Sequence, residues 1–92
     1  MNIEGKVKDI NEKARVAVVD IGWGEAVVVE FGDIGEIMEG DILRGLQRSY
    51  CVVDCANISQ RTEIQITVLS GSLPMQTARY IVTSELDVNA VA

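Results

Sequence analysis

The sequence predicts an all-β domain: a small, partly open barrel of five to six strands, OB-like or SH3-like, with a possible short C-terminal helix. It holds 13 valines and 10 isoleucines against 5 leucines, and β-branched side chains favour pleated sheet over helix. Its 8 glycines suit short strands joined by tight turns. A sheet in a chain of 92 residues buries its inner face by curling on itself. A two-sheet sandwich, which usually needs about 100 residues and seven strands, is the alternative.

The first two strands differ in their patterns. Residues 3–10 alternate, with Ile3 and Val7 on one face and charged side chains on the other, which is typical of a strand with one face in the core. Residues 11–13 form a turn. Residues 14–21 form a second strand that is apolar on both faces, which predicts a strand covered on both sides or one that crosses a barrel.

The only tryptophan of the chain stands between two glycines. Gly22, Trp23 and Gly24 are expected to form a hairpin tip, because glycines admit the positive backbone angles that tight hairpin turns require. Residues 25–31 then return as a third strand, whose core face lies at the odd positions.

A connection punctuated by glycines, residues 32–40, follows the third strand. Its apolar side chains predict one turn of helix that plugs the open end of the barrel: Ile34, Ile37 and Met38. A short fourth strand covers residues 41–46. The segment from Tyr50 to Asp54 fits either a strand or the end of a long loop.

The clearest alternation covers residues 62–69, where isoleucine and valine alternate with polar side chains. Beyond it two interpretations stay open. Pro74 can begin a helix, since proline is tolerated in a first turn, but residues 80–83 have the composition of a strand. Residues 85–92 are expected to be a frayed tail, so that a single barrel domain spans residues 1–84.

Four segments follow one another in a recognisable order: GKVKDINEKARVAVVD, VVVEF, IMEGDILRG and ITVLS. The similarity covers residues 5–69 and depends on a set of turn and strand positions: Gly5, Val7, Ile10, Asn11, Glu30, Gly40 and Asp41. In this order the chain resembles small uncharacterised bacterial proteins with an OB-like barrel. The resemblance implies a fold and almost no function, because OB-like barrels host many unrelated activities.

Charge is distributed unevenly along the chain, whose net charge is −6. Residues 1–15 carry +1, residues 16–43 carry −7 without a basic side chain, and residues 44–92 are balanced. An acidic block repels phosphate backbones and attracts cations or basic partners; the simpler interpretation is solubility. No apolar run approaches the roughly 20 residues that span a bilayer, and the chain opens without an apolar leader. We therefore expect a cytoplasmic protein without membrane contact.

Trp23 is the first candidate binding residue. We expect it either to project from the barrel rim, as tryptophans in interface hot spots do, or to fold back over the core. The second candidate group is the one that combines basic and aromatic side chains: Arg44, Arg48, Arg61 and Tyr50. Along one side of a barrel, this group would bind a single nucleic-acid strand or the acidic block of another copy. The alternative is scattered ion pairs that each contribute little.

The sequence predicts no catalytic residue, metal site or cofactor. Cys51 and Cys55 have C-x3-C spacing instead of the C-x2-C spacing of redox dithiols. The chain has no histidine to complete a zinc site, so both cysteines are expected to be free, buried thiols. The acids of residues 33–41 lack the alternating oxygen ligands of an EF-hand loop and are expected to be solvated turn residues.

Two functions are compatible with these patterns. The first is a non-enzymatic module that docks a protein partner or its own copy through the Trp23 rim and exposed strand edges. The second is an OB-type binder of single-stranded nucleic acid that uses Tyr50, the three arginines and the N-terminal lysines. The acidic charge disfavours the second function, because such domains use a basic groove.

Overall fold

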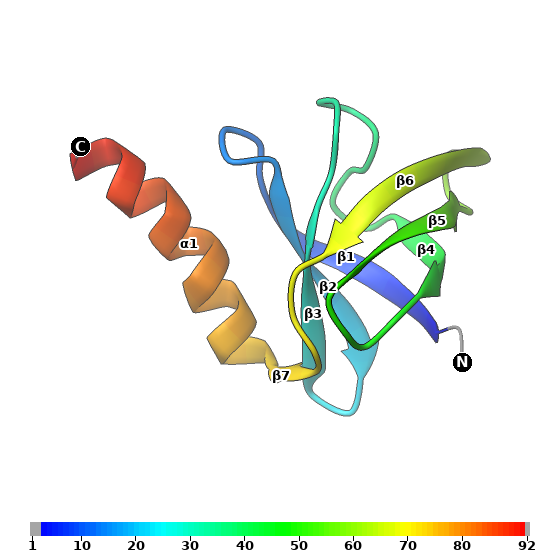
Figure 1. Cartoon of the computed structure of the whole chain (residues 1–92), viewed down its shortest axis with the longest axis horizontal. Coiled ribbons are helices and arrows are strands. Elements are labelled where there is room, and N and C mark those ends of the chain that lie inside the picture. Colours follow the sequence, from blue (N-terminus) through cyan, green and yellow to red (C-terminus); the bar gives the residue numbers. More distant parts are fainter. Residues whose placement is uncertain (1–2, 92) are drawn as a thin grey trace.

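A computed structural model describes the backbone of residues 3–91 and the side chains of residues 3–83. Six antiparallel strands close into a barrel, a short seventh strand lies outside it, and one helix runs along its outer wall (Figure 1). This architecture confirms the predicted small all-β barrel with a C-terminal helix. The elements are β1 (Ile3–Asn11), β2 (Val16–Gly22), β3 (Glu25–Glu30), β4 (Ile42–Leu46), β5 (Cys51–Asn57), β6 (Thr62–Val68), β7 (Leu73–Pro74) and α1 (Met75–Val91).

The barrel consists of two consecutive three-stranded meanders, β1-β2-β3 and β4-β5-β6. Strand β1 pairs with β4, and β3 pairs with β6, so the two meanders close into one ring. The two joins differ in extent. Four residues of β1 pair with β4, whereas β3 and β6 share only the pairs Val29↔Val68 and Glu30↔Thr67.

The antiparallel order sorts the connections to two ends of the barrel. Residues 23–24, 47–50 and 69–72 lie at one end, which we call the Trp23 end and which is the lower end in Figure 1. Residues 12–15, 31–41 and 58–61 lie at the opposite end. We call this the acidic end, because four acids of the connection 31–41 belong to it: Asp33, Glu36, Glu39 and Asp41.

Strands β2 and β3 are buried on both faces. Their inward side chains, such as Ala17 and Val19, join the barrel core, while Val16 and Val18 join a second cluster on the outside of the barrel. Helix α1 covers this outer face with Ala78 and Val82. The apolar run of the second strand therefore does mark a strand that is covered on both sides.

Helix α1 resolves the ambiguity of the C-terminal segment. Residues 80–83 are helical in spite of their strand-like composition, because Ala78 and Val82 lie one turn apart on the face that packs on β2 and β3. The helix continues to Val91, through residues 85–91, where the sequence predicts a frayed tail.

The connection 31–41 contains bends and turns instead of the predicted helical turn. Of its three apolar candidates for a plug, only Ile37 enters the core, where 2% of its surface stays exposed. Ile34 and Met38 face solvent. The prediction of a plugging helical turn is thus wrong, since the glycine-punctuated chain crosses the barrel end in tight turns and can insert one side chain.

Candidate functional site

The tip of the β2–β3 hairpin is a two-residue turn that holds Trp23 in solvent. Gly22 pairs with Glu25, and Trp23 and Gly24 between them have φ angles of 60° and 73°. Positive φ at both positions is the pattern of the type I′ turn that fits hairpin twist. The Trp23 side chain is 96% exposed. The indole therefore projects from the barrel and does not fold back over its end.

Neighbouring segments hold this tip in place. The amide of Gly22 donates to the Asp20 carboxylate at 2.8 Å, and the amide of Met75 donates to the Gly24 carbonyl at 2.9 Å. Strand β7 pairs with β3 directly above the tip, with Pro74 opposite Glu25. Trp23 thus stands on a turn that is fixed by β7 and the start of α1, and such preorganisation lowers the entropic cost of binding.

The backbone of Trp23 is strained, since a bulky residue at positive φ is a conformational outlier. We expect Trp23→Asn to raise the free energy of unfolding by about 1 kcal/mol, because asparagine tolerates this region of φ and the exposed indole contributes no packing. For a domain of this size the melting temperature then rises by about 4–8 °C. Thermal and urea unfolding measure the effect. Trp23→Ala, which keeps the positive φ and its strain, is the control and should leave stability unchanged. An Asn variant less stable than the wild type would contradict the claim that the Trp23 backbone is strained.

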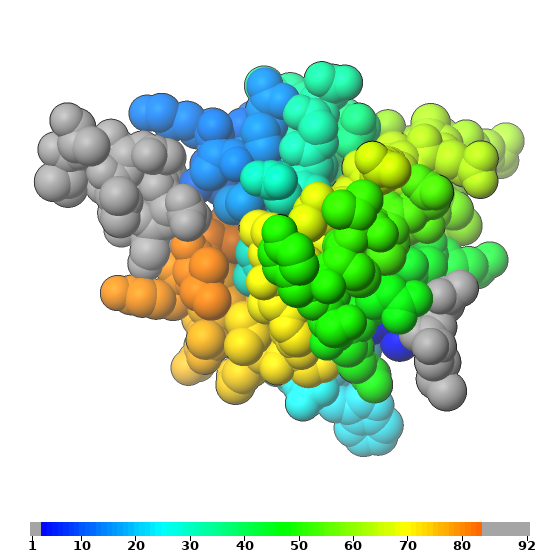
Figure 2. Space-filling view, in the orientation of Figure 1, coloured from blue at the N-terminus to red at the C-terminus, as the bar shows by residue number. Residues whose placement is uncertain are grey.

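Further exposed apolar side chains lie at the same end of the barrel. Tyr50 is 72% exposed and Val52 60%. The pair Cys51↔Val68, extended by one residue, puts Tyr50 opposite the exposed Leu69 on the outer face. Figure 2 shows the β2–β3 tip, in cyan, standing out at the lower edge, and the segment around Tyr50, in green, on the face toward the viewer.

Arg48 belongs to this end as well. A Cβ placed on Gly71 would lie 3.1 Å from the Arg48 carbonyl oxygen, so the connection 69–72 packs against the β4–β5 loop. Within the part of the chain whose side chains are described, Arg48 forms no ion pair. We define the Trp23 rim as the exposed side chains of Trp23, Arg48, Tyr50, Val52 and Leu69.

The structure does not bring Arg44 and Arg61 to this rim. Arg44 lies on the outer face of β4, where its Nη2 is 3.0 Å from the carboxylate of Glu4 on β1. Arg61 ends the β5–β6 turn, at the acidic end. The predicted row of three arginines beside Tyr50 is therefore divided among both ends and the wall of the barrel, because antiparallel strands alternate their turns between the two ends.

Asp41 has a role that its sequence position conceals. It is only 8% exposed and accepts hydrogen bonds from the Met38 amide at 2.9 Å, from Asn57 Nδ2 at 2.8 Å and from Gln60 Nε2 at 2.7 Å. Burial by itself raises the pKa of this carboxyl, but the three hydrogen bonds together hold its pKa below the ordinary value of 3.8. The prediction of a solvated turn residue is wrong for Asp41, which locks the connection 31–41 onto the β5–β6 turn.

A recurrent motif, missed in the sequence, forms both four-residue turns at the acidic end. In NEKAR and NISQR the asparagine side chain accepts the amide three residues on, at 3.0 Å from Ala14 and 3.2 Å from Gln60. The arginine that ends each turn has a φ near 60°. Each asparagine Nδ2 also donates to the backbone of another segment: Asn11 to the Val82 carbonyl of α1, and Asn57 to the Glu36 carbonyl of the connection 31–41. The Asn-x3-Arg recurrence is the signal that identifies these residues.

Both cysteines are free, as predicted, and belong to the inward face of β5; Cys55 is buried as predicted, whereas Cys51, at the start of the strand, is only partly buried. Burial, with the nearby Asp54 and Glu36 carboxylates, raises the pKa of the Cys55 thiol to about 11. At neutral pH this thiol is protonated and is a poor nucleophile. Among the described residues, no group of three or more His, Cys, Asp or Glu side chains is arranged to hold a metal ion.

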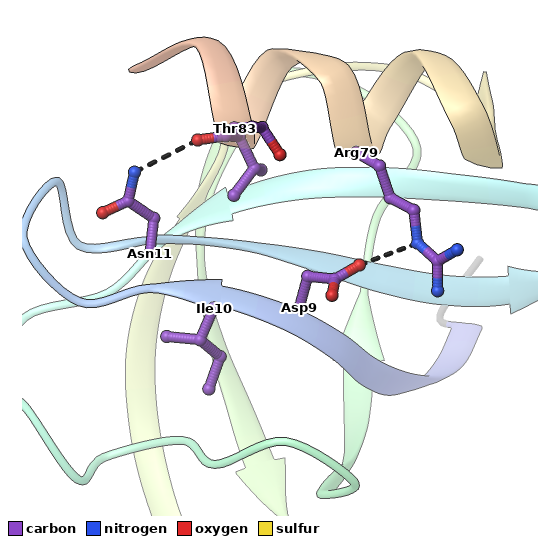
Figure 3. A pocket seen from close by; sticks show the side chains of 6 residues that line it. Asp9, Ile10, Asn11, Arg79 and Thr83 are labelled. Atoms are coloured by element: carbon purple, nitrogen blue, oxygen red, sulfur yellow. Dashed lines mark hydrogen bonds and ion pairs between the residues drawn. The ribbon is translucent and has the colours of Figure 1, made fainter. Parts of the chain in front are cut away.

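A shallow groove of about 440 Å³ separates α1 from β1 (Figure 3). A β-bulge between Val7 and Asp9 turns Asp9 and Asn11 outward beneath the helix, where Arg79 Nε lies 2.7 Å from the Asp9 carboxylate. Asn11 Nδ2 donates to the Val82 carbonyl at 3.1 Å. These contacts fasten the helix to the barrel, and the half-exposed ion pair contributes little stability by itself.

Comparison of the chain with protein-family models, with curated proteins and with solved structures finds no match. In the described part of the chain, no helix combines the length and apolar character needed to span a membrane.

Proposed function

We propose that this protein is a non-enzymatic binding module that docks a protein partner, or a second copy of itself, through the Trp23 rim. The observation that carries the proposal is the geometry of Trp23. Its turn has a strained backbone and is fixed by β7 and the start of α1, and it keeps a large apolar side chain almost fully in water. Backbone strain that the surrounding structure maintains is common at functional sites. The proposal includes the cytoplasmic location expected from the sequence.

The composition of the rim supports a protein partner. Tryptophan, tyrosine and arginine are the residues most enriched in interface hot spots, and Trp23, Tyr50 and Arg48 share this end of the barrel. Val52 and Leu69 add apolar surface around them. Asp20 and Glu25, which flank the tip, favour a partner surface that is neutral or basic.

Site-specific photo-cross-linking tests this proposal. The photoreactive amino acid benzoylphenylalanine replaces Trp23 in one variant and Tyr80 in a matched control, because Tyr80 is an exposed aromatic residue of α1 outside the rim. We expect a discrete protein adduct from position 23 and none from position 80, and Trp23→Ala should weaken binding of the identified partner about thirtyfold, as at a hot spot. Equal adducts at both positions, or no adduct at position 23, would refute the proposal.

Light scattering coupled to size-exclusion chromatography identifies the occupant. If the rim docks a second copy, the wild-type chain forms a dimer and Trp23→Ala is a monomer. If the rim docks another protein, the wild-type chain and Trp23→Ala are both monomers. The adduct from position 23 then has a mass that differs from twice the mass of one chain. A dimer that Trp23→Ala leaves intact would place self-association elsewhere.

Binding of single-stranded nucleic acid is the second candidate function. The observation in its favour is that Trp23, Tyr50 and Arg48 lie at one end of the barrel, since aromatic side chains and arginine stack on bases. Fluorescence of Trp23 reports on this directly. The second function requires quenching by an oligonucleotide at low salt that weakens steeply as salt rises; an unchanged emission spectrum excludes it.

A further inference from the structure

Strand β6 has one free edge near the acidic end. All seven of its residues pair with β5, from Thr62↔Asn57 to Val68↔Cys51. On the other side, β3 reaches only Thr67 and Val68. In the part of the chain that the structure describes, Thr62 to Ile66 therefore pair on one side only.

Pairing between β3 and β6 ends here because the residues that follow β3 form their hydrogen bonds with other partners. The amide of Phe31 donates to the Arg15 carbonyl at 2.9 Å, so the end of β3 stays with β2. The amide of Gly32 donates to Glu36 Oε1 at 3.3 Å, within the same connection. No described hydrogen bond joins the connection 31–41 to the backbone of residues 62–66.

Two residues present the unpaired backbone groups. The amide of Leu69 donates to the Val28 carbonyl, so Leu69 directs its backbone groups toward β3. Alternate residues of a strand direct their groups to the same edge, which gives Thr67, Gln65 and Glu63. Thr67 meets Glu30, whereas Gln65 and Glu63 have no described backbone partner on this side. Buried unpaired backbone groups are rare, so these groups face water.

The surroundings of the free edge are acidic. Glu63 is exposed on β6, Glu30 is exposed where β3 ends, and Asp33 and Glu36 follow in the adjacent connection. Two bases lie nearby: Arg15, just before β2, donates to the Gly32 carbonyl, and Arg61 directly precedes β6 at its far end. A second copy would bring the same acids together, whereas a cationic segment would offset them.

We propose that the free edge of β6 binds an extended segment with lysine or arginine at alternate positions. The segment adds a strand: its backbone bonds the amides and carbonyls of Glu63 and Gln65, and its basic side chains lie beside Glu30 and Glu63. Exposed edges are templates for such pairing. The site lies at the opposite end of β6 from the Trp23 rim, so each surface can be disabled without the other.

A labelled peptide measures this binding on the full chain. The probe is a fluorescein-tagged hexapeptide of alternating lysine and valine, followed by anisotropy at low salt. Two comparison peptides separate the contributions: alternating glutamate and valine reverses the charge, and N-methylation of the interior amides keeps the charge but removes the donors. We expect each change to weaken binding more than about tenfold, because the N-methylated peptide loses several hydrogen bonds and the acidic peptide meets like charges. Equal binding of the N-methylated peptide would overturn strand addition, and equal binding of the acidic peptide would overturn the charge assignment.

Two substitutions locate the site on the protein. Glu63→Lys should weaken the lysine–valine peptide about fivefold or more, while Glu39→Lys, with the same charge change on the far side of the connection, should not. Gln65→Pro removes an edge donor that β5 does not use, and proline is tolerated on edge strands; it should weaken the peptide, with folding checked by circular dichroism. Equal effects of Glu63→Lys and Glu39→Lys would overturn the site. So would a dimer, found by sedimentation, that Gln65→Pro abolishes, because the edge would then hold a second copy.

Discussion

Replacing Gly5 by alanine is expected to lower the free energy of unfolding by about 3 kcal/mol, at the upper end of the cost of an overpacked core. A Cβ at position 5 would lie 2.5 Å from Val19 Cγ1, 2.9 Å from the Asp20 carbonyl oxygen and 3.1 Å from Leu46 Cδ1. The carbonyl belongs to the backbone of β2, so rotation of a side chain cannot relieve it. Glycine at this position allows β1 to approach β2 closely inside the barrel.

Urea unfolding of Gly5→Ala measures this cost, and Gly32→Ala provides the matched control. A Cβ on Gly32 would find its nearest neighbour at 3.4 Å, the flexible carboxylate of Glu36, and the Gly32 backbone does not lie in the left-handed region. Gly32→Ala should therefore change stability by less than about 1 kcal/mol. If both variants unfold at the same urea concentration, close packing of β1 against β2 does not explain the glycine.

The wall of the barrel was predictable because alternation and its absence report burial directly. The apolar run Val16–Val19 predicts a strand covered on both sides, and the structure places α1 over its outer face. The pattern cannot say which element provides the cover. Residues 80–83 have strand propensity but are helical, with Val82 packed on that face beside Ala78, so tertiary contacts outweigh local preference.

The grouping of the candidate binding residues depended on topology, which spacing in the sequence does not contain. Arg44, Arg48 and Tyr50 are close along the chain, yet Arg44 lies on the wall, bound to Glu4, while Arg48 and Tyr50 lie in the turn. Trp23 joins them because the hairpin β2–β3 ends at the same end of the barrel. That assignment requires the strand order, and strand order follows from long-range pairing.

The acids of the connection 31–41 illustrate a second limit. In the sequence Asp33, Glu36, Glu39 and Asp41 look alike, and only the fold distinguishes them. Asp41 is buried because Asn57 and Gln60, from the β5–β6 turn, provide the donors that a buried carboxylate requires. Partners so far away along the chain are invisible to a local pattern, although the recurrent Asn-x3-Arg motif marks Asn57 as a residue that shapes a turn.

Replacing Asp41 by alanine is expected to lower the free energy of unfolding by about 3 kcal/mol at pH 7, because buried donors left without an acceptor carry their full desolvation cost. The Met38 amide loses its acceptor. The side-chain amides of Asn57 and Gln60 each lose one acceptor and keep another, the carbonyls of Glu36 and Gly35. Asp33→Ala, an exposed acid of the same connection, is the matched control and should leave stability nearly unchanged. Urea unfolding of the two variants compares a buried acid with a solvated one.

The stabilisation from Asp41 should also depend on pH in a direction that its pKa determines. Folding holds the pKa of this carboxyl below 3.8, so the unfolded chain binds the proton more readily than the folded protein does. The contribution of the ionised carboxylate to stability is therefore fully present when the pH is above the unfolded pKa, and it is lost as the pH falls through the folded pKa. We expect the wild type to lose stability more steeply than Asp41→Asn below about pH 5, so that the two converge in acid. Parallel stability curves for the two proteins between neutral and acid pH would mean that the network does not hold Asp41 as an anion.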